Sequence, residues 1–217
     1  PAETLEATTS FSQLAPASDA SNPILAVVLK RNGTDEVVEL SRRIGEIGDS
    51  KLAISKWIHF DDPAGKQIFW HSSAHLLGAA VESLHFSQWD AESMKHLNSV
   101  PRETKLVTKE QLEGRVVPLL DDGPPLPETT GGFYYDFYLS PQHLGEESFG
   151  KLEKLVAKLV KQKSKFERLE VSRSFALDLF SYNPFKVALI NKIPDNEKVT
   201  LYKTAGFIDL CRGPHLS

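Results

Sequence analysis

The order of strand-like and helix-like segments between residues 131 and 210 places the strongest limit on how this chain can fold. Four segments have the aromatic, β-branched or alternating character of strands, namely 131–137, 185–190, 199–203 and 207–210. Two segments, 146–166 and 172–182, carry apolar residues at the three- and four-residue spacing of helices. This order predicts an α+β fold with a mostly antiparallel sheet packed against helices.

The composition excludes several broad classes of protein. The 217 residues are 41% hydrophobic and carry a net charge of −4, which excludes a basic surface that coats nucleic acid but leaves a local basic face open. No apolar run reaches the roughly 20 residues that span a bilayer, so we expect no membrane partner. The single cysteine excludes a disulfide scaffold and favours a reducing compartment.

Composition also predicts three segments along the chain. Residues 1–22 are rich in Ala, Ser, Thr and Pro and are interpreted as a flexible leader. Residues 23–65 form a small β-rich module that opens with a hairpin at 24–40, its turn at Asn32–Gly33. Residues 66–217 form the main domain, with a long polar insertion at about 85–130. The chain lacks an initiator Met, so we expect a part of a longer protein or a free-standing version of such a part.

A helix predicted at 68–84 carries a pair of histidines away from its apolar stripe. The stripe consists of Leu77, Ala80, Val81 and Leu84. Another face of the helix carries His71, His75, Gly78 and Glu82. Histidines four residues apart lie about 6 Å from one another on one helix face, as in zinc proteases. No Glu lies between them, so the protease reading lacks its general base. Gly78 makes room either for a ligand or for helix packing, and the pair serves either chemistry or ordinary core hydrogen bonding.

A second pair, Cys211 and His215, has the same spacing near the end of the chain. Gly213 and Pro214 lie between them and predict a turn that determines how both side chains project. Together with the first pair they offer three imidazoles and one thiol, which is a complete zinc ligand set. The same four side chains are equally suited to line a pocket in which imidazoles position a water molecule.

Four further side chains are candidates for the same site. Asp209 lies two residues before the cysteine on a predicted strand, so both point to one face; the alternative is a surface carboxylate. Lys186 lies inside a predicted apolar strand, where it faces either solvent or the site. Tyr134 and Tyr135 point to opposite faces of a strand, so at most one of them reaches the pocket.

A lysine-rich segment overlaps the helix predicted at 146–166. Such a segment is ordinarily a solvated surface, although in an acidic chain it also suits a phosphate backbone. Its members are Lys151, Lys154, Lys158, Lys161, Lys163 and Lys165.

Five segments, in their order along the chain, resemble the N-terminal half of threonyl-tRNA synthetase. They are Phe69–Gly78, Gly132–Phe137, Phe166–Val171, Tyr182–Lys186 and Asp209–His215. The resemblance implies the editing-domain fold that threonyl- and alanyl-tRNA synthetases share. The hairpin at 24–40 is similar to the opening strands of the small TGS module that precedes this domain, so 23–65 is expected to be a divergent, TGS-like module.

The resemblance implies proofreading in the cytoplasm, by hydrolysis of the ester of serine mischarged on threonine tRNA. The partners are then the acceptor end of that tRNA and the remaining synthetase domains. By motif match, the catalytic residues are His71, His75, Lys186, Cys211 and His215. Of these, His75 and Lys186 would hold or activate the attacking water and the ribose hydroxyls. Asp209 and one of Tyr134 and Tyr135 would contact the seryl group or the terminal adenosine.

The resemblance implies no metal cofactor. The alanyl relatives bind zinc through the four corresponding residues, whereas the threonyl editing domains generally act without it. Zinc, if bound, would therefore be held by His71, His75, Cys211 and His215.

The sequence departs from the family in ways that leave an alternative open. The TGS-like part is short, the 85–130 segment is long, Tyr202–Gly206 differs from the family pattern, and no counterpart of the ligase domain is present. A structural protein of the mitochondrial large ribosomal subunit is similar to the same N-terminal half, and its partner would be the ribosome. The intact set of His, His, Cys and His favours the editing reading, because a structural descendant need not keep a pocket.

Overall fold

The structure is a computed structural model, and it describes residues 7–31, 33–48, 53–86, 115–118, 131–140, 144–181 and 183–217. The described residues divide into two compact units. The first contains the residues up to Ser72 together with Gly131 and Gly213–Ser217, and the second contains the rest. The first part of the helix that follows residue 65, up to Ser72, belongs to the first unit, as does the end of the chain.

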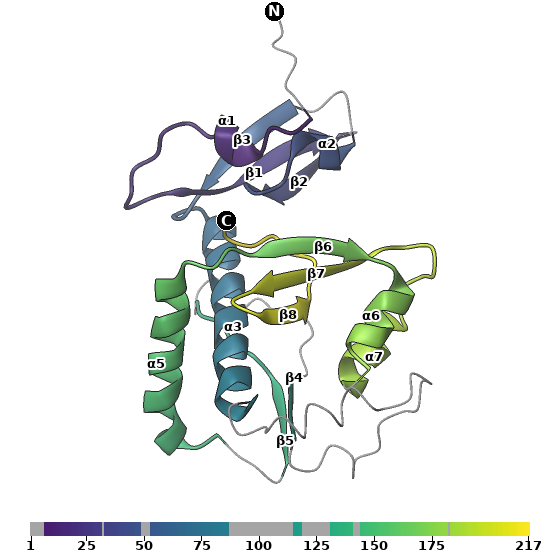
Figure 1. Ribbon diagram of the computed structural model, residues 1–217. Coiled ribbons are helices and arrows are strands. Elements are labelled where there is room, and N and C mark those ends of the chain that lie inside the picture. Colours follow the sequence, from purple (N-terminus) through teal and green to yellow (C-terminus); the bar gives the residue numbers. More distant parts are fainter. Residues whose placement is uncertain are drawn as a thin grey trace, which may run out of the picture. The chain divides into compact units, whose positions relative to one another are not determined.

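The first unit contains a three-stranded antiparallel sheet. Strand β1 (Ile24–Arg31) lies in its centre, between β2 (Thr34–Glu39) and β3 (Ala53–His59) (Figure 1). The predicted hairpin at 24–40 is therefore confirmed. Gly33 occupies its turn with a φ of +86°, a conformation that glycine adopts readily, while Asn32 lies outside the described residues.

Two short helices, α1 (Phe11–Leu14) and α2 (Ile44–Ile47), belong to the core of this unit. Phe11 is completely buried beside Val27 and Leu29 of β1, and Ser10 forms a β-bridge with Arg43. The predicted flexible leader therefore contains, in its described part, a helical turn that is packed. The reason is that Phe11 buries a large aromatic surface, a contribution that the polar composition around it conceals.

Helix α3 (Pro63–Phe86) is longer at both ends than the helix predicted at 68–84. Pro63 is its first residue, where the absent N–H and the restricted φ of proline suit a helix start. The predicted apolar stripe is confirmed, since Ala80 and Val81 are buried and Leu77 and Leu84 pack beside them.

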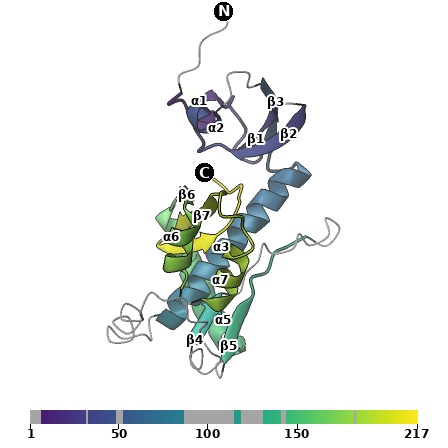
Figure 2. The ribbon, with the colours of Figure 1, turned by 90° about the vertical axis from the view of Figure 1, so that its right-hand side faces the viewer.

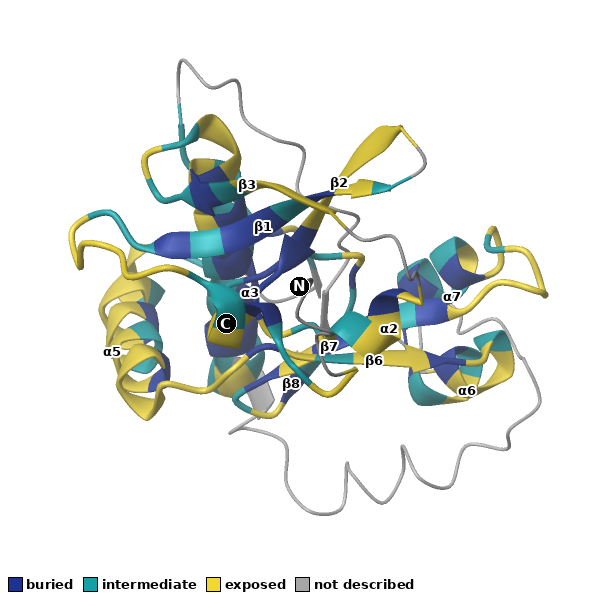
Figure 3. Cartoon of the chain, turned by 90° about the horizontal axis from the view of Figure 1, so that it is seen from above, coloured by how far each residue is buried: buried dark blue, intermediate teal, exposed yellow. Residues whose placement is uncertain are grey.

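In the second unit, α3 shares a core with α5 (Glu146–Gln162). Figure 3 shows a largely exposed surface along α5, and all six lysines named above are exposed. The helix ends before the predicted residue 166 because Lys163 adopts a left-handed φ of +50°. The core of this layer consists of Ala74, Ala79, Ala80, Val81, Tyr135, Leu152, Leu159 and Phe207.

The second unit also contains an antiparallel sheet in the order β6-β7-β8. Its strands are β6 (Glu167–Val171), β7 (Val199–Thr204) and β8 (Phe207–Leu210), which confirm the strands predicted at 199–203 and 207–210. Ala205 and Gly206, both with positive φ, join the last two strands in a tight hairpin. Helices α6 (Arg173–Leu179) and α7 (Pro184–Ile190) contribute to the core on one face, where Ala176 and Ile190 cluster with Val199 and Leu201.

A separate pair of strands, β4 (Arg115–Pro118) and β5 (Phe137–Ser140), is antiparallel (Figure 2). The strand predicted at 131–137 is wrong for 131–136, because Gly131 and Gly132 take φ values of +61° and +108° that extended strands exclude. Of the predicted insertion at about 85–130, the structure describes only the end of α3 and β4.

The strand predicted at 185–190 is wrong, because these residues form most of helix α7. The Asn183 side chain accepts hydrogen bonds from the N–H groups of Phe185 and Lys186, both at 3.1 Å, and Pro184 follows as the first helical residue. An N-cap followed by proline starts a helix, and this local signal outweighs the strand-like apolar run behind it. The α+β class is confirmed, and every pairing between the described strands is antiparallel. None of the described helices has the length and apolar character to cross a membrane.

The Asn183 cap provides a test of how α7 is held. We expect Asn183→Ala to lower the free energy of unfolding by about 2 kcal/mol, the upper end for a lost N-cap, because Asn183 is fully buried and caps two N–H groups. Ser172→Ala, which removes the exposed single-bond cap of α6, should lower it by about 1 kcal/mol. Urea denaturation measures both changes. A smaller loss for Asn183→Ala than for Ser172→Ala would contradict this account.

Candidate functional site

The Asp209 carboxylate is the centre of a buried polar network in the second unit. Its Oδ2 atom accepts a hydrogen bond of 2.6 Å from the Tyr135 hydroxyl and lies 3.2 Å from Nδ1 of His75. Its Oδ1 atom pairs with the Lys186 ammonium. Asp209 and Lys186 are 0% exposed and His75 is 1% exposed. The alternative of a surface carboxylate at Asp209 is therefore wrong.

Four separate segments of the chain contribute to this network. Asp209 lies on β8 opposite Tyr202, and Lys186 is the third residue of α7. His75 comes from α3, and Tyr135 from the irregular segment that precedes β5. The alternative of a solvent-facing Lys186 is wrong as well, because the Lys186 side chain is completely buried. Lys186 lies in helix α7 and not in the predicted strand.

The charges in the network determine which ring nitrogen of His75 carries a proton. Burial alone would raise the pKa of Asp209, but the Lys186 charge and the hydrogen bonds from His75 and Lys186 outweigh it and hold this pKa well below its usual range. An ionised carboxylate only accepts hydrogen bonds, so Nδ1 of His75 carries the proton. In the neutral ring, Nε2 of His75 is then the acceptor. Lys186 also lies 4.9 Å from the centroid of the Phe180 ring, a favourable position for a cation.

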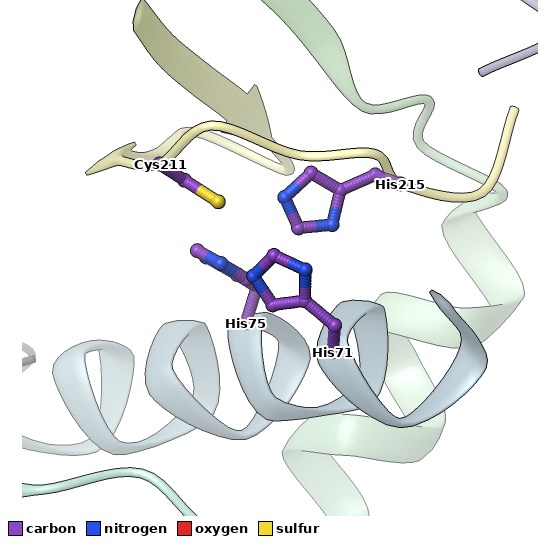
Figure 4. Close-up of side chains that lie close together, drawn as sticks. All are labelled: His71, His75, Cys211 and His215. Carbon is purple, nitrogen blue, oxygen red and sulfur yellow. The ribbon is translucent and has the colours of Figure 1, made fainter. Parts of the chain in front are cut away.

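The two predicted pairs of side chains come together. His71 and His75 extend from α3, and Cys211 and His215 extend toward them from the segment after β8 (Figure 4). One ligand atom from each of the four residues lies within 4.8 Å of the others. His71 is half-buried and the other three are buried, so His71 offers the group a connection to solvent.

Ser72 is a member of the site that the sequence did not indicate. It is completely buried, its Oγ lies 3.2 Å from Nδ1 of His215, and it accepts a hydrogen bond of 3.1 Å from the N–H of Leu216. The rings of His71 and His215 have centroids 4.4 Å apart. Ser72 therefore orients His215 as Asp209 orients His75. The only signal in the sequence is a small polar residue directly beside the histidine pair.

The four-residue group fits a zinc ion. Three imidazoles and one thiol match the ligand types of zinc sites, and their ligand atoms are already close to one another. Zinc-binding histidines usually donate their second N–H to a carboxylate or another oxygen, which is the bond that His75 makes to Asp209. The predicted ligand set His71, His75, Cys211 and His215 is thus compatible with a metal by type, proximity and outer hydrogen bonds.

The two tyrosines have different environments. Tyr135 is buried and reaches Asp209, whereas Tyr134 is half-buried. Gly78 explains why the Tyr135 ring fits, because a Cβ at this position would lie 2.8 Å from Cε2 of the ring. Of the two alternatives for Gly78, the structure therefore shows close packing against Tyr135, itself a predicted substrate-binding residue.

Glu82 is a further charged group on the histidine face of α3. Burial raises its pKa from the ordinary 4.5 to about 7, with Lys186 lowering the value and Asp209 raising it. The sequence placed Glu82 on this face correctly, but only the packed structure determines its charge. Near neutral pH, Glu82 is therefore an acid that can exchange a proton beside the network.

These features define an α+β protein with a buried Lys–Asp–His network beside a group of three histidines and one cysteine. No protein-family model matches the chain. It is 36% identical over 191 residues, 88% of the chain, to the cytoplasmic threonine–tRNA ligase of Caenorhabditis elegans. It is 32% identical over 197 residues, 91% of the chain, to the cytoplasmic threonine–tRNA ligase 1 of Homo sapiens. The chain spans about a fifth of the length of these curated relatives, 21% of each.

The chain is a homologue of the N-terminal part of threonyl-tRNA synthetases. A probable cytoplasmic threonine–tRNA ligase 1 of Dictyostelium discoideum, 31% identical over 191 residues, supports the same assignment. The family named from sequence motifs is therefore confirmed.

Gly78→Ala tests the packing of Tyr135 against α3. The added Cβ would push the ring away and break its bond to Asp209, so we expect the free energy of unfolding to fall by about 1–3 kcal/mol, as for an overpacked core. Gly150→Ala on α5, where nothing lies within 4 Å, should instead raise it by about 1 kcal/mol through helix propensity. Urea denaturation distinguishes the two signs, and a stabilising Gly78→Ala would show that Tyr135 is not held in this way.

The raised pKa of Glu82 predicts a pH dependence of stability. Between pH 4.5 and about 7 the folded chain keeps a proton at Glu82 that the unfolded chain has lost, so rising pH favours unfolding across this window. The shift corresponds to at most about 3 kcal/mol. We expect Glu82→Gln to remove this decline, while the exposed Glu153→Gln on α5 leaves it unchanged. Urea denaturation at pH 5 and pH 7.5 measures the difference, and identical pH profiles for Glu82→Gln and the wild type would contradict the prediction.

Proposed function

We propose that this chain is the proofreading part of a threonyl-tRNA synthetase and hydrolyses the ester that joins serine to the tRNA for threonine. The homology to threonine–tRNA ligases supports the substrate class. The observation that carries the reaction is His75, whose Nδ1 is directed to the ionised Asp209 and whose Nε2 is thereby an acceptor.

The chemistry of the two amino acids explains why a second site is needed. Serine differs from threonine by the loss of one methyl group, and a binding pocket discriminates against such a loss by only about 1–3 kcal/mol. A separate hydrolytic site removes the product that the first site fails to reject. The site described here offers imidazoles as proton acceptors, which is what hydrolysis of an ester requires.

In the proposed step, Nε2 of His75 accepts a proton from water while the water oxygen attacks the seryl carbonyl carbon. The bond between that carbon and the ribose oxygen breaks, and the ribose oxygen takes up the proton that Nε2 of His75 received from the water. His71, Cys211 and His215 would border the reacting group, and His71, which is half-buried while the other three are buried, is the member that a substrate would reach first.

Lys186, Asp209 and Tyr135 act as positioning residues in this proposal. All three are buried, and their polar atoms are directed to one another. Lys186 keeps Asp209 ionised, and Asp209 holds His75 in the reactive tautomer, as a buried aspartate does in a serine-protease triad. The half-buried Tyr134 is the member of the tyrosine pair that is open to contact the seryl group or the terminal adenosine.

A zinc ion bound by His71, His75, Cys211 and His215 would supply Lewis-acid polarisation of a carbonyl oxygen. Asp209, Lys186 and Tyr135 are proposed to orient His75, and this role requires no metal.

The proposal extends to the partners and the compartment. We propose that the acceptor end of threonine tRNA is the substrate and that ligase domains of the same protein, like those of the relatives, charge it. The named relatives are cytoplasmic ligases, which favours the cytoplasm and gives no support to the mitochondrial ribosomal alternative. Residues 23–65 as a TGS-like module and 66–217 as the editing domain remain part of this proposal.

Hydrolysis of seryl-tRNA is the direct test. We expect the protein to deacylate threonine tRNA carrying serine, and His75→Ala to slow the reaction by at least about 100-fold, because a positioned acid–base group contributes about 10²–10⁴-fold. Release of labelled serine measures the rate, and circular dichroism verifies the fold of the variant. A chelator in parallel reactions reports on metal, and we expect the activity to survive it.

The matched control is His59→Asn, which changes a histidine outside the group and keeps a donor toward the Asn22 carbonyl. This variant should act like the wild type. Threonyl-tRNA serves as the second substrate and should be hydrolysed more slowly than seryl-tRNA. The proposal would be overturned by wild-type protein that leaves seryl-tRNA intact, or by a folded His75→Ala variant with full activity.

A further inference from the structure

A basic groove lies in the second unit, beside the group of histidines and cysteine. The residues that line it belong to the end of α7 and the loop after it, the start of β7, and the segment that follows β8. Its volume is about 600 Å³, which is within the size range of sites that bind small molecules. Of the residues that line it, only Cys211 belongs to the proposed hydrolytic site.

The groove concentrates positive charge on an acidic chain. Lys192, Lys198 and Arg212 line it and are exposed, against one carboxylate in the described lining, that of Glu197. Within the described part of the chain, none of the three cations lies within 4.0 Å of a carboxylate. Their charges are therefore available to an anionic ligand.

Most of the remaining lining residues are apolar. Leu189, Ile193 and Leu210 are half-buried and line the groove together with the cations. An apolar surface flanked by cations suits a ligand that combines flat bases with phosphates. Single-stranded nucleic acids bind in positively charged grooves, and an unpaired base can be held by apolar side chains. A simple anion would need no such surface.

Cys211 connects the groove to the reactive group. It lines the groove, and its ligand atom lies within 4.8 Å of those of His71, His75 and His215. A strand of nucleic acid in the groove would thus have one end at the proposed site of ester cleavage. Lys192 and Lys198 come from the loop between α7 and β7, and Arg212 comes from the segment after β8, so two segments of the chain supply the three cations.

We propose that this groove binds the nucleotides that precede the aminoacylated end of the RNA, with their phosphodiesters on Lys192, Lys198 and Arg212 and a base on the apolar surface. The inference rests on the proposed function for the identity of the terminal nucleotide. It adds a second binding region, which recognises the single-stranded end of the RNA and not the amino acid.

The first experiment measures binding without any hydrolysis. A fluorescent cytidine-cytidine-adenosine trinucleotide, which has the sequence of the tRNA 3′ end and two internal phosphodiesters, is titrated with the protein at several salt concentrations. We expect log K to fall with log salt with a slope of about −1.4, or about −0.7 for each single-strand phosphate contacted. The triple variant Lys192→Ala, Lys198→Ala, Arg212→Ala should lose most of this slope and bind about tenfold more weakly, as for one lost charged hydrogen bond.

The matched control removes the same charge from another surface of the unit. The triple variant Lys151→Ala, Lys154→Ala, Lys158→Ala on α5 carries three exposed substitutions and should retain the wild-type slope and affinity. If the α5 variant loses as much affinity as the groove variant, binding reflects overall charge, and the assignment to the groove is wrong. Unchanged binding by the groove variant overturns the inference as well.

The second experiment uses seryl esters of adenosine and of the trinucleotide. We expect the ratio of kcat/KM for the trinucleotide ester to that for the adenosine ester to fall about tenfold in the groove variant, because only the longer ester reaches the groove. An unchanged ratio contradicts the inference. If neither ester is cleaved but trinucleotide binding depends on the three cations, the proposed function fails while the groove assignment stands.

Discussion

The ion pair between Lys186 and Asp209 is the interaction on which the rest of the site depends. Two buried charges are costly to remove from water, and they persist only when their remaining hydrogen-bonding capacity is satisfied. Tyr135, His75 and the Leu210 N–H complete the shell around the Asp209 carboxylate. Several features of the fold serve this arrangement, including the Asn183 cap that starts α7 and the missing Cβ of Gly78 that admits the Tyr135 ring.

The network and the group of histidines and cysteine have complementary roles. The network is closed, since its charged members are fully buried and directed to one another. The group is open at His71, and it adjoins the basic groove through Cys211. The closed network determines the tautomer of His75, and the open group beside it is accessible to a substrate. An acid–base site requires this division, because preorganised groups must hold the group that reacts.

Local patterns predicted much of the fold, and the failures have physical causes. The apolar stripe of α3 and the hairpin at 24–40 follow from strong periodicity and a glycine turn, and both are confirmed. Residues 185–190 read as a strand because they are apolar and include Val and Ile, but the cap at Asn183 and the proline behind it start a helix. Residues 131–136 were predicted as a strand because aromatic residues are frequent in strands. Two glycines with positive φ interrupt the extended backbone there. In both places a short capping or glycine signal outweighs a weak periodic one.

The sequence by itself determined which residues carry chemistry and how each pair is spaced. His71 and His75 share a helix face, and Cys211 and His215 flank a turn, because these relations depend on four or five consecutive residues. Only the tertiary structure decided burial and charge. Lys186 and Asp209 are 23 residues apart, Tyr135 and Asp209 are 74 apart, and Ser72 and His215 are 143 apart. The pKa of a side chain depends on how far water is excluded and on which charges stand beside it, and both are properties of segments that meet only when the chain is folded.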